Sequence, residues 1–295
     1  MSMAILQDES NRGQRLRRLL LAGGWQTWKR LVRKPVKLRL FNGASFRAYP
    51  DCTCSSATFY SRVPNYRTLS FLRSRMDGNG TLLDVGANVG LVSMLLADQV
   101  QNAVLFEPNP VAAARAKENI AINGFPFEVQ EIALSDETGT ISFEDVGGVN
   151  TCNRTVINFS TAAPTRIVKR TSFDRFLADH GPFEVPVSTV KIDVEGHEVA
   201  VIRGMRHLLV TDRPRTVMFE YLQRTNLAEA LKIFASVDYR VMALLPNGTV
   251  APVTLSTPPL QDLFAVPAEH SGAEHGFKFT NESTSCALQS AMSVS

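Results

Sequence analysis

The chain has 295 residues, of which 44% are hydrophobic and 20% are charged, and its formal net charge is +3. These values are typical of a globular protein with a sizeable core, either one large α/β domain with extensions or two small domains. No apolar run approaches the roughly 20 residues that span a bilayer, and the start of the chain lacks a secretory pattern. We therefore expect a cytoplasmic protein. A disulfide framework is excluded because the cysteines are few and scattered, so we expect free thiols at Cys52, Cys54, Cys152 and Cys286.

Positive charge gathers at the start of the chain. Residues 1–50 hold eleven Arg and Lys against two acidic residues, a net charge of +9, which leaves −6 for the rest. Within residues 12–39, Leu, Trp and Val recur at roughly helical spacing, with an interruption at Gly23-Gly24. We expect residues 1–50 to form a basic extension that is helical and then begins a β-hairpin.

This extension has two open interpretations. It is either a helical cap on the main domain with a solvated basic face, or an attachment to an anionic membrane surface through residues 12–39, which would make the protein peripherally membrane-bound. Nucleic acid is not an expected partner, because no recognition motif accompanies the charge.

Beyond the extension, the predicted elements follow a regular order. Residues 36–63 alternate enough to predict a short hairpin with Asn42-Gly43 at its turn, and residues 64–76 predict a helix. Strands and helices then alternate, which predicts right-handed crossovers and a mostly parallel sheet covered on both faces. The expected strands are residues 82–85, 103–107, 127–132, 187–192, 216–220, 240–244 and 263–266. The expected helices are residues 91–97, 110–123, 199–209 and 227–235.

Two segments depart from this rhythm. Residues 133–172 are polar with short β-like runs, and we interpret them as an inserted pair of antiparallel strands near the ligand pocket. Residues 268–295 are rich in Ser, Thr, Glu and Gly, which predicts a disordered tail.

The clearest chemical signal is the turn TLLDVGANVG at residues 81–90. Asp84 ends an apolar strand, Gly86 and Gly90 allow tight turning, and Asn88 lies between them. Glu107 ends the next strand, 23 residues after Asp84. Ligands of doubly wound sheets bind beyond such strand ends, and a carboxylate there accepts two hydrogen bonds from the hydroxyls of a ribose.

The order of residues in this turn separates two cofactor classes. A dinucleotide fingerprint needs Gly-x-Gly-x-x-Gly so that a pyrophosphate can lie on a helix N-terminus. Here an acid precedes the glycines and an asparagine replaces one of them. That pattern favours a ligand with a cationic amino-acid end, such as S-adenosylmethionine, over a nicotinamide cofactor.

A second constellation, VKIDVEGHE, places three acids and a histidine at the end of another predicted strand. Asp193 or Glu195 could orient or deprotonate an acceptor hydroxyl, and His197 titrates in a suitable range. Alternatively, Glu195 and Glu198 cap the following helix and His197 lies on its face. Glu220, at the next strand end, is a candidate substrate contact. Asp193, Glu195 and Glu220 together could bind a divalent cation, but nothing in the sequence fixes that geometry, so we expect no metal.

Several segments resemble the FkbM family of S-adenosylmethionine-dependent methyltransferases. In order they are LLDVGANVGLVSMLLA, VLFEPNP, ENIAIN, IALSDETGTISF, VKIDVEGHEVAVIRGMRHLL and RPRTVMFEY, and the likeness covers about residues 60–266. The resemblance implies a Rossmann-like, doubly wound class I methyltransferase fold whose seven-stranded sheet has an antiparallel last strand. It implies methyl transfer to a hydroxyl oxygen of a sugar, glycan or polyketide-like metabolite. We accordingly expect a methyltransferase domain over residues 51–267.

The same resemblance assigns cofactor contacts. Asp84, Gly86, Asn88 and Gly90 would hold the methionine portion, and Glu107 would bind the ribose. The adenine would be flanked by Ala133, Leu134, Ser135 and Asp136. Asn65-Tyr66 stands where many members have an acid, and the basic extension lies outside the shared region. Two alternatives remain: a membrane-recruited module that binds S-adenosylmethionine without activity, and an N-methyltransferase.

Overall fold

The largest sheet lies at the centre of the molecule. The computed structural model describes residues 2–144, 165–245, 249–258 and 262–270. Strand order in the sheet is β12-β11-β13-β10-β9-β3-β4-β5. The five parallel strands are β3 (Thr81–Val85), β4 (Asn102–Phe106), β5 (Phe127–Gln130), β9 (Val187–Ile192) and β10 (Thr216–Glu220). This is the doubly wound arrangement that the sequence predicts.

The edge beyond β10 differs slightly from the expectation. The last strand, β13 (Asp262–Pro267), pairs antiparallel with both β10 and β11 (Tyr239–Leu244), as predicted. In the described part of the chain, however, the sheet has eight strands rather than seven. The additional strand is β12 (Val250–Pro252), which folds back on β11 in an antiparallel pair at the edge.

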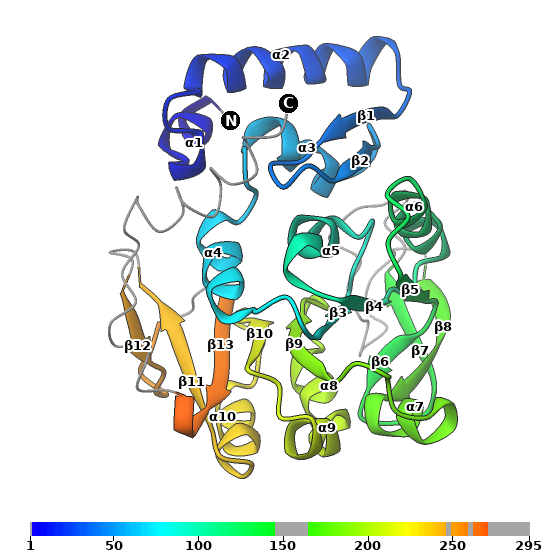
Figure 1. The fold of residues 1–295 in the computed structure, drawn as a ribbon, viewed down its shortest axis with the longest axis vertical. Coiled ribbons are helices and arrows are strands. Elements are labelled where there is room, and N and C mark those ends of the chain that lie inside the picture. The colour runs from blue at the N-terminus through cyan, green and yellow to red at the C-terminus, as the bar shows by residue number, and fades with distance from the viewer. Residues whose placement is uncertain (1, 145–164, 246–248, 259–261, 271–295) are drawn as a thin grey trace.

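Two apolar cores cover the faces of the sheet (Figure 1). One face carries α4 (Tyr66–Arg75), α5 (Leu91–Leu96) and α6 (Pro110–Ala121). The other carries α7 (Phe173–His180), α8 (Glu198–Gly204), α9 (Arg206–Thr211) and α10 (Leu227–Ala235). The short η2 (Ala97–Gln99) extends α5. Alternate residues of each strand enter opposite cores, as Leu82 and Leu83 do, because successive side chains point to opposite faces.

One predicted helix is interrupted. The sequence predicts a single helix over residues 199–209, but the structure divides it between α8 and α9 at Met205. Gly204 passes so close to the inserted strands that an added Cβ would lie 1.8 Å from the backbone oxygen of Ser135. Helix α7, which the sequence reading did not identify, packs Phe173 and Phe176 into the same core.

The inserted strands form a small sheet of their own. It consists of β6 (Ala133–Ser135), β7 (Gly139–Glu144) and β8 (Thr165–Ser172) in the order β6-β8-β7. Strands β7 and β8 are the predicted antiparallel pair, and β6 runs parallel to β8. The rest of the predicted insertion, residues 145–164, lies outside the described residues.

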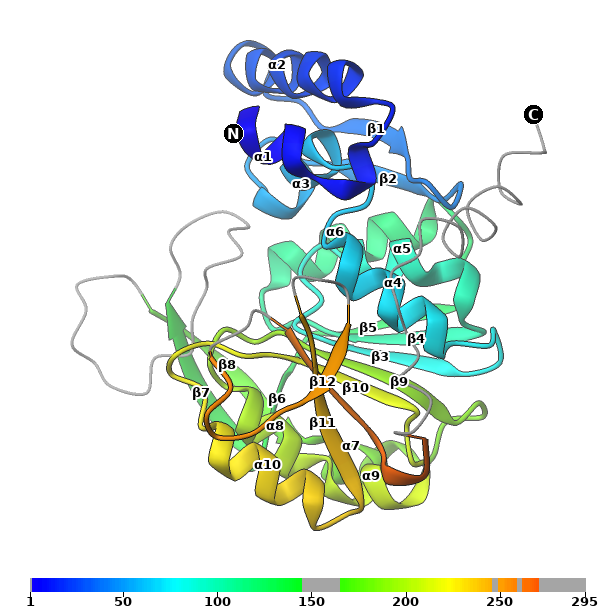
Figure 2. The same cartoon turned by 90° about the vertical axis from the view of Figure 1, so that its left-hand side faces the viewer.

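The start of the chain forms a cap above the sheet (Figures 1 and 2). This N-terminal cap, residues 2–60, contains α1 (Ser2–Gln7), η1 (Glu9–Asn11), α2 (Arg15–Leu31), β1 (Val36–Arg39), β2 (Ser45–Ala48) and α3 (Thr53–Tyr60). The predicted hairpin is present as β1 and β2. Residues 53–60, placed within that alternating segment by the sequence, are helical instead.

Helix α2 continues through Gly23-Gly24, contrary to the predicted interruption. Packing explains this continuity. Trp25 stacks on Phe59 with ring centroids 4.1 Å apart, and its Nε1 donates to Ser56 Oγ at 3.0 Å. These contacts pack α2 against α3, so the packed unit extends past residue 50, where we expect the extension to end. The domain boundary at residue 50 stays a prediction.

Only the first three residues of the predicted C-terminal tail are described. Residues 268–270 of the predicted tail form the short η3 (Ala268–His270), and residues 271–295 lie outside the described part. Among the residues that the structure describes, no helix combines the length and apolar character needed to cross a membrane.

Candidate functional site

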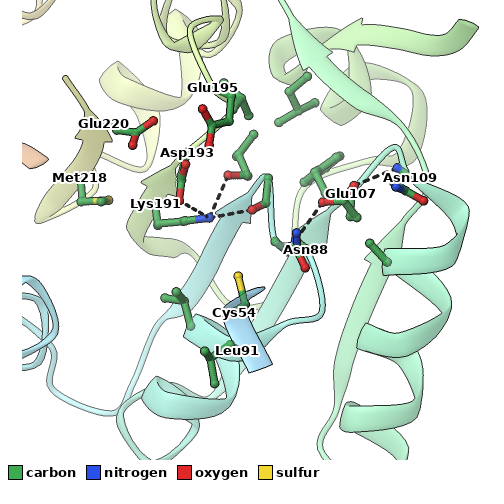
Figure 3. A pocket seen from close by; sticks show the side chains of 18 of the residues that line it. Cys54, Asn88, Leu91, Glu107, Asn109, Lys191, Asp193, Glu195, Met218 and Glu220 are labelled. Atoms are coloured by element: carbon green, nitrogen blue, oxygen red, sulfur yellow. Dashed lines mark hydrogen bonds and ion pairs between the residues drawn. The ribbon is translucent and has the colours of Figure 1, made fainter. Parts of the chain in front are cut away.

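A cavity of about 350 Å³ lies between the carboxyl ends of the central strands and the N-terminal cap. Its floor comes from the ends of β3, β4, β9 and β10, and its roof includes Cys54 and Ala57 of α3. Figure 3 shows carboxylates from β9 and β10 on one side and Glu107 with Asn88 on the other. The volume falls in the range of small-molecule sites.

The turn after β3 is shaped by close backbone approach. Gly86 has a φ of +74°, and an added Cβ would lie 2.0 Å from the carbonyl oxygen of Asp193. Only glycine fits this position. Asn88 also has a left-handed φ of 51°. Gly86 and Asn88 both line the cavity. Gly90 does not: it begins α5 and packs against Leu105 instead of reaching a ligand.

Asp84 lies beneath the cavity rather than on its wall. It is fully buried, and its Oδ2 accepts a hydrogen bond of 2.7 Å from Ser93 Oγ. Its Oδ1 lies 3.1 Å from Lys191 Nζ. The sequence predicts direct contact of Asp84 with the methionine portion. In the structure its carboxylate is used to hold a buried lysine.

Lys191 is the residue that sequence reasoning missed. Its ammonium donates to the Gly86 carbonyl at 2.7 Å and lies 3.7 Å from Asp193 Oδ2 (Figure 3). Burial by itself would lower the pKa of Lys191, but Asp84 and Asp193 outweigh burial and raise it. A lone lysine inside the apolar run STVKI was the available signal, since buried lysines require paired carboxylates.

Glu107 is fixed from two directions. Its Oε2 accepts from the backbone N–H of Asn88 and its Oε1 from that of Asn109, both at 2.8 Å. The side chain is buried yet lines the cavity. Burial raises the pKa of Glu107 to about 7, against the opposing effect of these two N–H donors. Each oxygen retains acceptor capacity, so the group is suited to a pair of hydroxyls.

The residues predicted around adenine separate into two groups. Ala133 and Leu134 line the cavity, as do Ile141 and Val168 of the small sheet. Ser135 and Asp136 are not among its lining residues. Asp136 forms an ion pair with Arg203 on α8, and contact of these two residues with adenine stays a prediction.

Ser135 instead positions the predicted histidine. Its Oγ lies 2.9 Å from Nε2 of His197, which itself lines the cavity. Burial lowers the pKa of His197, which favours a neutral imidazole. Glu198 is buried at the start of α8 and accepts from the Gly196 N–H at 2.7 Å, which is the helix-start alternative that the sequence left open for it.

Asp193, Glu195 and Glu220 meet at the opposite side of the cavity. They offer carboxylate oxygens that all lie within 4.8 Å of one another. Glu195 is paired with Arg224 at 3.1 Å. Oε2 of Glu220 is buried with no hydrogen-bond partner in the described part of the chain. Burial, reinforced by Asp193 and Glu195, raises the pKa of Glu220 to about 8. Hard cations bind carboxylate oxygens of this kind. The absence of a metal, which we expect from the sequence, therefore stays a prediction.

Two of the four cysteines lie at the start of α3, in or beside the roof of the cavity. Cys52 and Cys54 are free thiols, as expected. A hydrogen bond from Cys54 lowers the pKa of Cys52 to about 6. Cys152 and Cys286 lie outside the described residues.

Comparison with known proteins gives a consistent result. Residues 84–241 match the model of the methyltransferase FkbM domain, which confirms the resemblance seen in the sequence. The chain is 30% identical over 141 residues to the hexuronic acid methyltransferase AglP of Haloferax volcanii, an alignment covering 48% of this chain and 56% of that protein. It is 26% identical over 198 residues to the 2-O-methyltransferase NoeI of Sinorhizobium fredii, covering 59% and 78%.

Among solved structures, the methyltransferase FkbM from Methylobacillus flagellatus KT aligns with a TM-score of 0.44 and 13% identity. That alignment covers 87% of this chain and 60% of the other. The alignment with AglP, by contrast, spans little more than half the length of that relative.

Proposed function

Because this chain belongs to the FkbM methyltransferase family, we propose that it transfers the methyl group of S-adenosylmethionine to a hydroxyl oxygen of a sugar or glycan. The family supports the cofactor. The names of the two relatives, a hexuronic acid methyltransferase and a 2-O-methyltransferase, support the acceptor class. A polyketide-like acceptor stays an expectation of the resemblance.

The observation that carries the proposal is the fixed carboxylate of Glu107. Two backbone N–H groups hold it on the cavity wall beside the turn after β3. In this assignment Glu107 binds the ribose, Gly86 and Asn88 contact the methionine portion, and Ala133 and Leu134 flank the adenine. When bound, S-adenosylmethionine supplies an electrophilic methyl group on a sulfonium.

The residues of the chain must then align and deprotonate the acceptor. Methyl transfer is an in-line displacement, and positioning can supply about 7–11 kcal/mol in favourable cases. Of the three predicted catalytic residues, Glu195 is paired with Arg224 and His197 is held by Ser135. Asp193 lines the cavity with a side chain that is 42% exposed, and its ion pair with Lys191 is longer, at 3.7 Å, than the 3.1 Å pair of Glu195 with Arg224. We assign Asp193 to orient and deprotonate the hydroxyl, and Glu220 to contact the acceptor.

The test combines binding with product identification. Calorimetry should show S-adenosylmethionine binding, and labelled methyl groups should appear on oxygen in saccharides of a cell extract. Absence of binding would contradict the cofactor assignment. Binding without transfer would favour the inactive binding module, and label on nitrogen would favour the N-methyltransferase.

We also propose that the N-terminal cap brings a cytoplasmic protein to anionic membrane surfaces. Along α2, Leu16, Leu20 and Leu31 are each at least 70% exposed. Residues 12–39 contain no acidic residue, and eight of their ten basic residues are exposed. Exposed leucines beside basic residues are suited to the headgroup region of a membrane. In Figures 1 and 2, α2 lies on the side of the cap away from the sheet.

Vesicle sedimentation tests this proposal. We expect binding to phosphatidylcholine vesicles that contain phosphatidylserine, and little binding to phosphatidylcholine alone. Substituting Leu16, Leu20 and Leu31 with Gln should abolish it, whereas the exposed Val210→Gln on α9 is a matched control. Equal binding to both vesicle types, or none to either, would contradict the proposal.

A further inference from the structure

A second, open cavity of about 520 Å³ adjoins the first. Asn65 and Thr68 line both cavities, so the two share a wall at the start of α4. The other walls come from distant parts of the chain: the end of α1 with η1, the end of β11, and β13. We call this second cavity the outer groove.

The outer groove leads to the carboxylates of the first cavity. Asp262 lines the groove and faces Glu220 in the antiparallel register of β13 and β10. Thr68 on the shared wall donates a hydrogen bond to Asp262. A molecule that contacts Asp262 on β13 is therefore one strand away from Glu220 on β10.

We propose that the outer groove binds the methyl acceptor, and that it selects a neutral or amino sugar over a uronic acid. This inference rests on the proposed function, because it deepens the assignment of a sugar acceptor. It also departs from the activity in the name of the first relative, a hexuronic acid methyltransferase.

The lining suits sugar hydroxyls. Asp8, Glu9 and Asp262 supply carboxylates, each with one oxygen already engaged by Ser10, Arg67 or Thr68, and Gln7 supplies an amide. Carboxylates accept hydrogen bonds from hydroxyls, and the amide both donates and accepts. Tyr66 adds a partly buried aromatic side chain next to them.

The charge balance opposes an anionic sugar. The only cation lining the groove among the described residues is Arg67, and it is paired with Glu9. Further inward, the cations are already taken: Lys191 is paired with Asp84 and Asp193, and Arg224 is paired with Glu195. A uronate would therefore meet the carboxylates of Asp8 and Asp262, and the described residues around it offer only cations that already have acidic partners, which suppresses binding.

The groove is also built outside the part of the chain that the family model matches. Its lining residues fall at 4–9, 65–68, 244 and 262–264, and all of them lie outside the match, which covers residues 84–241. The matched segment contains the turn after β3, Glu107, Ala133 and Leu134, which line the first cavity. Of the groove residues, 4–9 also lie outside the segment that resembles the family, about residues 60–266, so they are where a difference in acceptor from the relatives can arise.

The first experiment asks which saccharides receive the label. A cellular saccharide extract is divided by anion exchange into an acidic fraction and a neutral-plus-amino fraction, and each is incubated with the protein and methyl-labelled S-adenosylmethionine. We expect label in the neutral-plus-amino fraction. Label mainly in uronic acids would overturn the charge selection while leaving the proposed function intact. No label in either fraction would overturn both.

The second experiment uses the Glu9–Arg67 pair. Glu9→Gln leaves Arg67 without its carboxylate and should raise kcat/KM several-fold for acidic saccharides relative to neutral ones. Arg67→Gln is the matched opposite change and should lower that ratio. Tyr66→Ala should raise the KM for the labelled neutral acceptor several-fold, with Gln99→Ala as a surface control. S-adenosylhomocysteine affinity, measured by calorimetry, should be unchanged throughout. Unchanged ratios, or an equal loss of cofactor affinity, would overturn the groove as acceptor site.

Discussion

The two sides of the main cavity are stabilised in different ways. On the cofactor side, each charged group has defined partners: Asp84 holds Lys191, and Glu107 accepts from two backbone N–H groups. On the acceptor side, Asp193 and Glu220 stand close together with fewer matching cations, and the pKa of Glu220 is raised to about 8. Paired charges keep a site rigid, whereas crowded carboxylates hold protons that can move. In the proposed function, the first side binds the cofactor and the second acts on the acceptor.

The largest effect should come from the closest backbone contact. In Gly86→Ala, the new Cβ would lie 2.0 Å from the carbonyl oxygen of Asp193, at a φ of +74°. We expect loss of cofactor binding and a lower melting temperature, because the turn must move away from β9. Gly43→Ala is the matched control: its φ is +85°, but no atom lies within 4 Å of the added Cβ. It should cost only left-handed strain, about 1–3 kcal/mol. Equal behaviour of the two variants in calorimetry would contradict the contact.

The next effect should fall on turnover alone. Asp193→Asn removes the proposed base and should lower kcat by about 10²–10⁴-fold, with S-adenosylhomocysteine affinity nearly unchanged. Asp179→Asn, in an exposed helix pair with Arg175, is the control. A similar loss of affinity in Asp193→Asn would move Asp193 to the cofactor side of the comparison.

Glu107→Gln should show the opposite division. We expect cofactor binding to weaken by about 1–3 kcal/mol, the cost of losing charge-assisted hydrogen bonds. The acceptor KM should change little at saturating cofactor. Glu131→Gln, an exposed partner of Lys117, serves as control in the same calorimetric titration. Unchanged affinity would mean that the ribose assignment is wrong.

The same carboxylate predicts a pH dependence. Burial raises the pKa of Glu107 to about 7, so the free protein holds it protonated below that pH and ionised above it. Hydroxyls donate to the ionised form, so cofactor affinity should rise as the pH is raised through 7 and then level off. Calorimetry with S-adenosylhomocysteine across this range should show the rise in the wild type and a flat profile in Glu107→Gln. A fall in affinity would give the wrong sign for this assignment.

The smallest effect should follow metal removal. We expect methyl transfer to be unchanged by a chelator, because the sequence predicts no metal. The nearby oxygens of Asp193, Glu195 and Glu220 make this a direct test. Activity lost with the chelator and restored by Mg²⁺ would instead assign a cation to the acceptor side.

Local patterns allowed much of the fold to be predicted. Strands β3 and β4 could be predicted because each is an apolar run that ends in an acid. Of these acids, Glu107 lines the cavity, and Asp84 lies beneath it. Longer-range contacts were harder. Gly23-Gly24 indicates a break when read locally, but Trp25 packing on Phe59 keeps α2 continuous.

The site shows the same limit. Asp84 follows the expected motif, yet its role depends on Lys191, more than one hundred residues later in the chain, which no local pattern connects to it. The outer groove joins residues 4–9 to β13 and has no signature in the sequence. Motifs pointed to Gly86, Asn88 and Glu107 because these residues lie at the ends of two consecutive strands, whereas the outer groove joins segments that no single motif contains.

The position of β13 has a consequence for how the sheet is completed. This strand follows β11 and β12 in the chain, yet it lies between β10 and β11. During synthesis, β10 and β11 therefore have unpaired edges until β13 emerges from the ribosome. Such edges promote aggregation, so translation that stops before residue 262 should yield an aggregation-prone chain. Asp262, at the start of β13, is also among the last residues of the groove to be put in place.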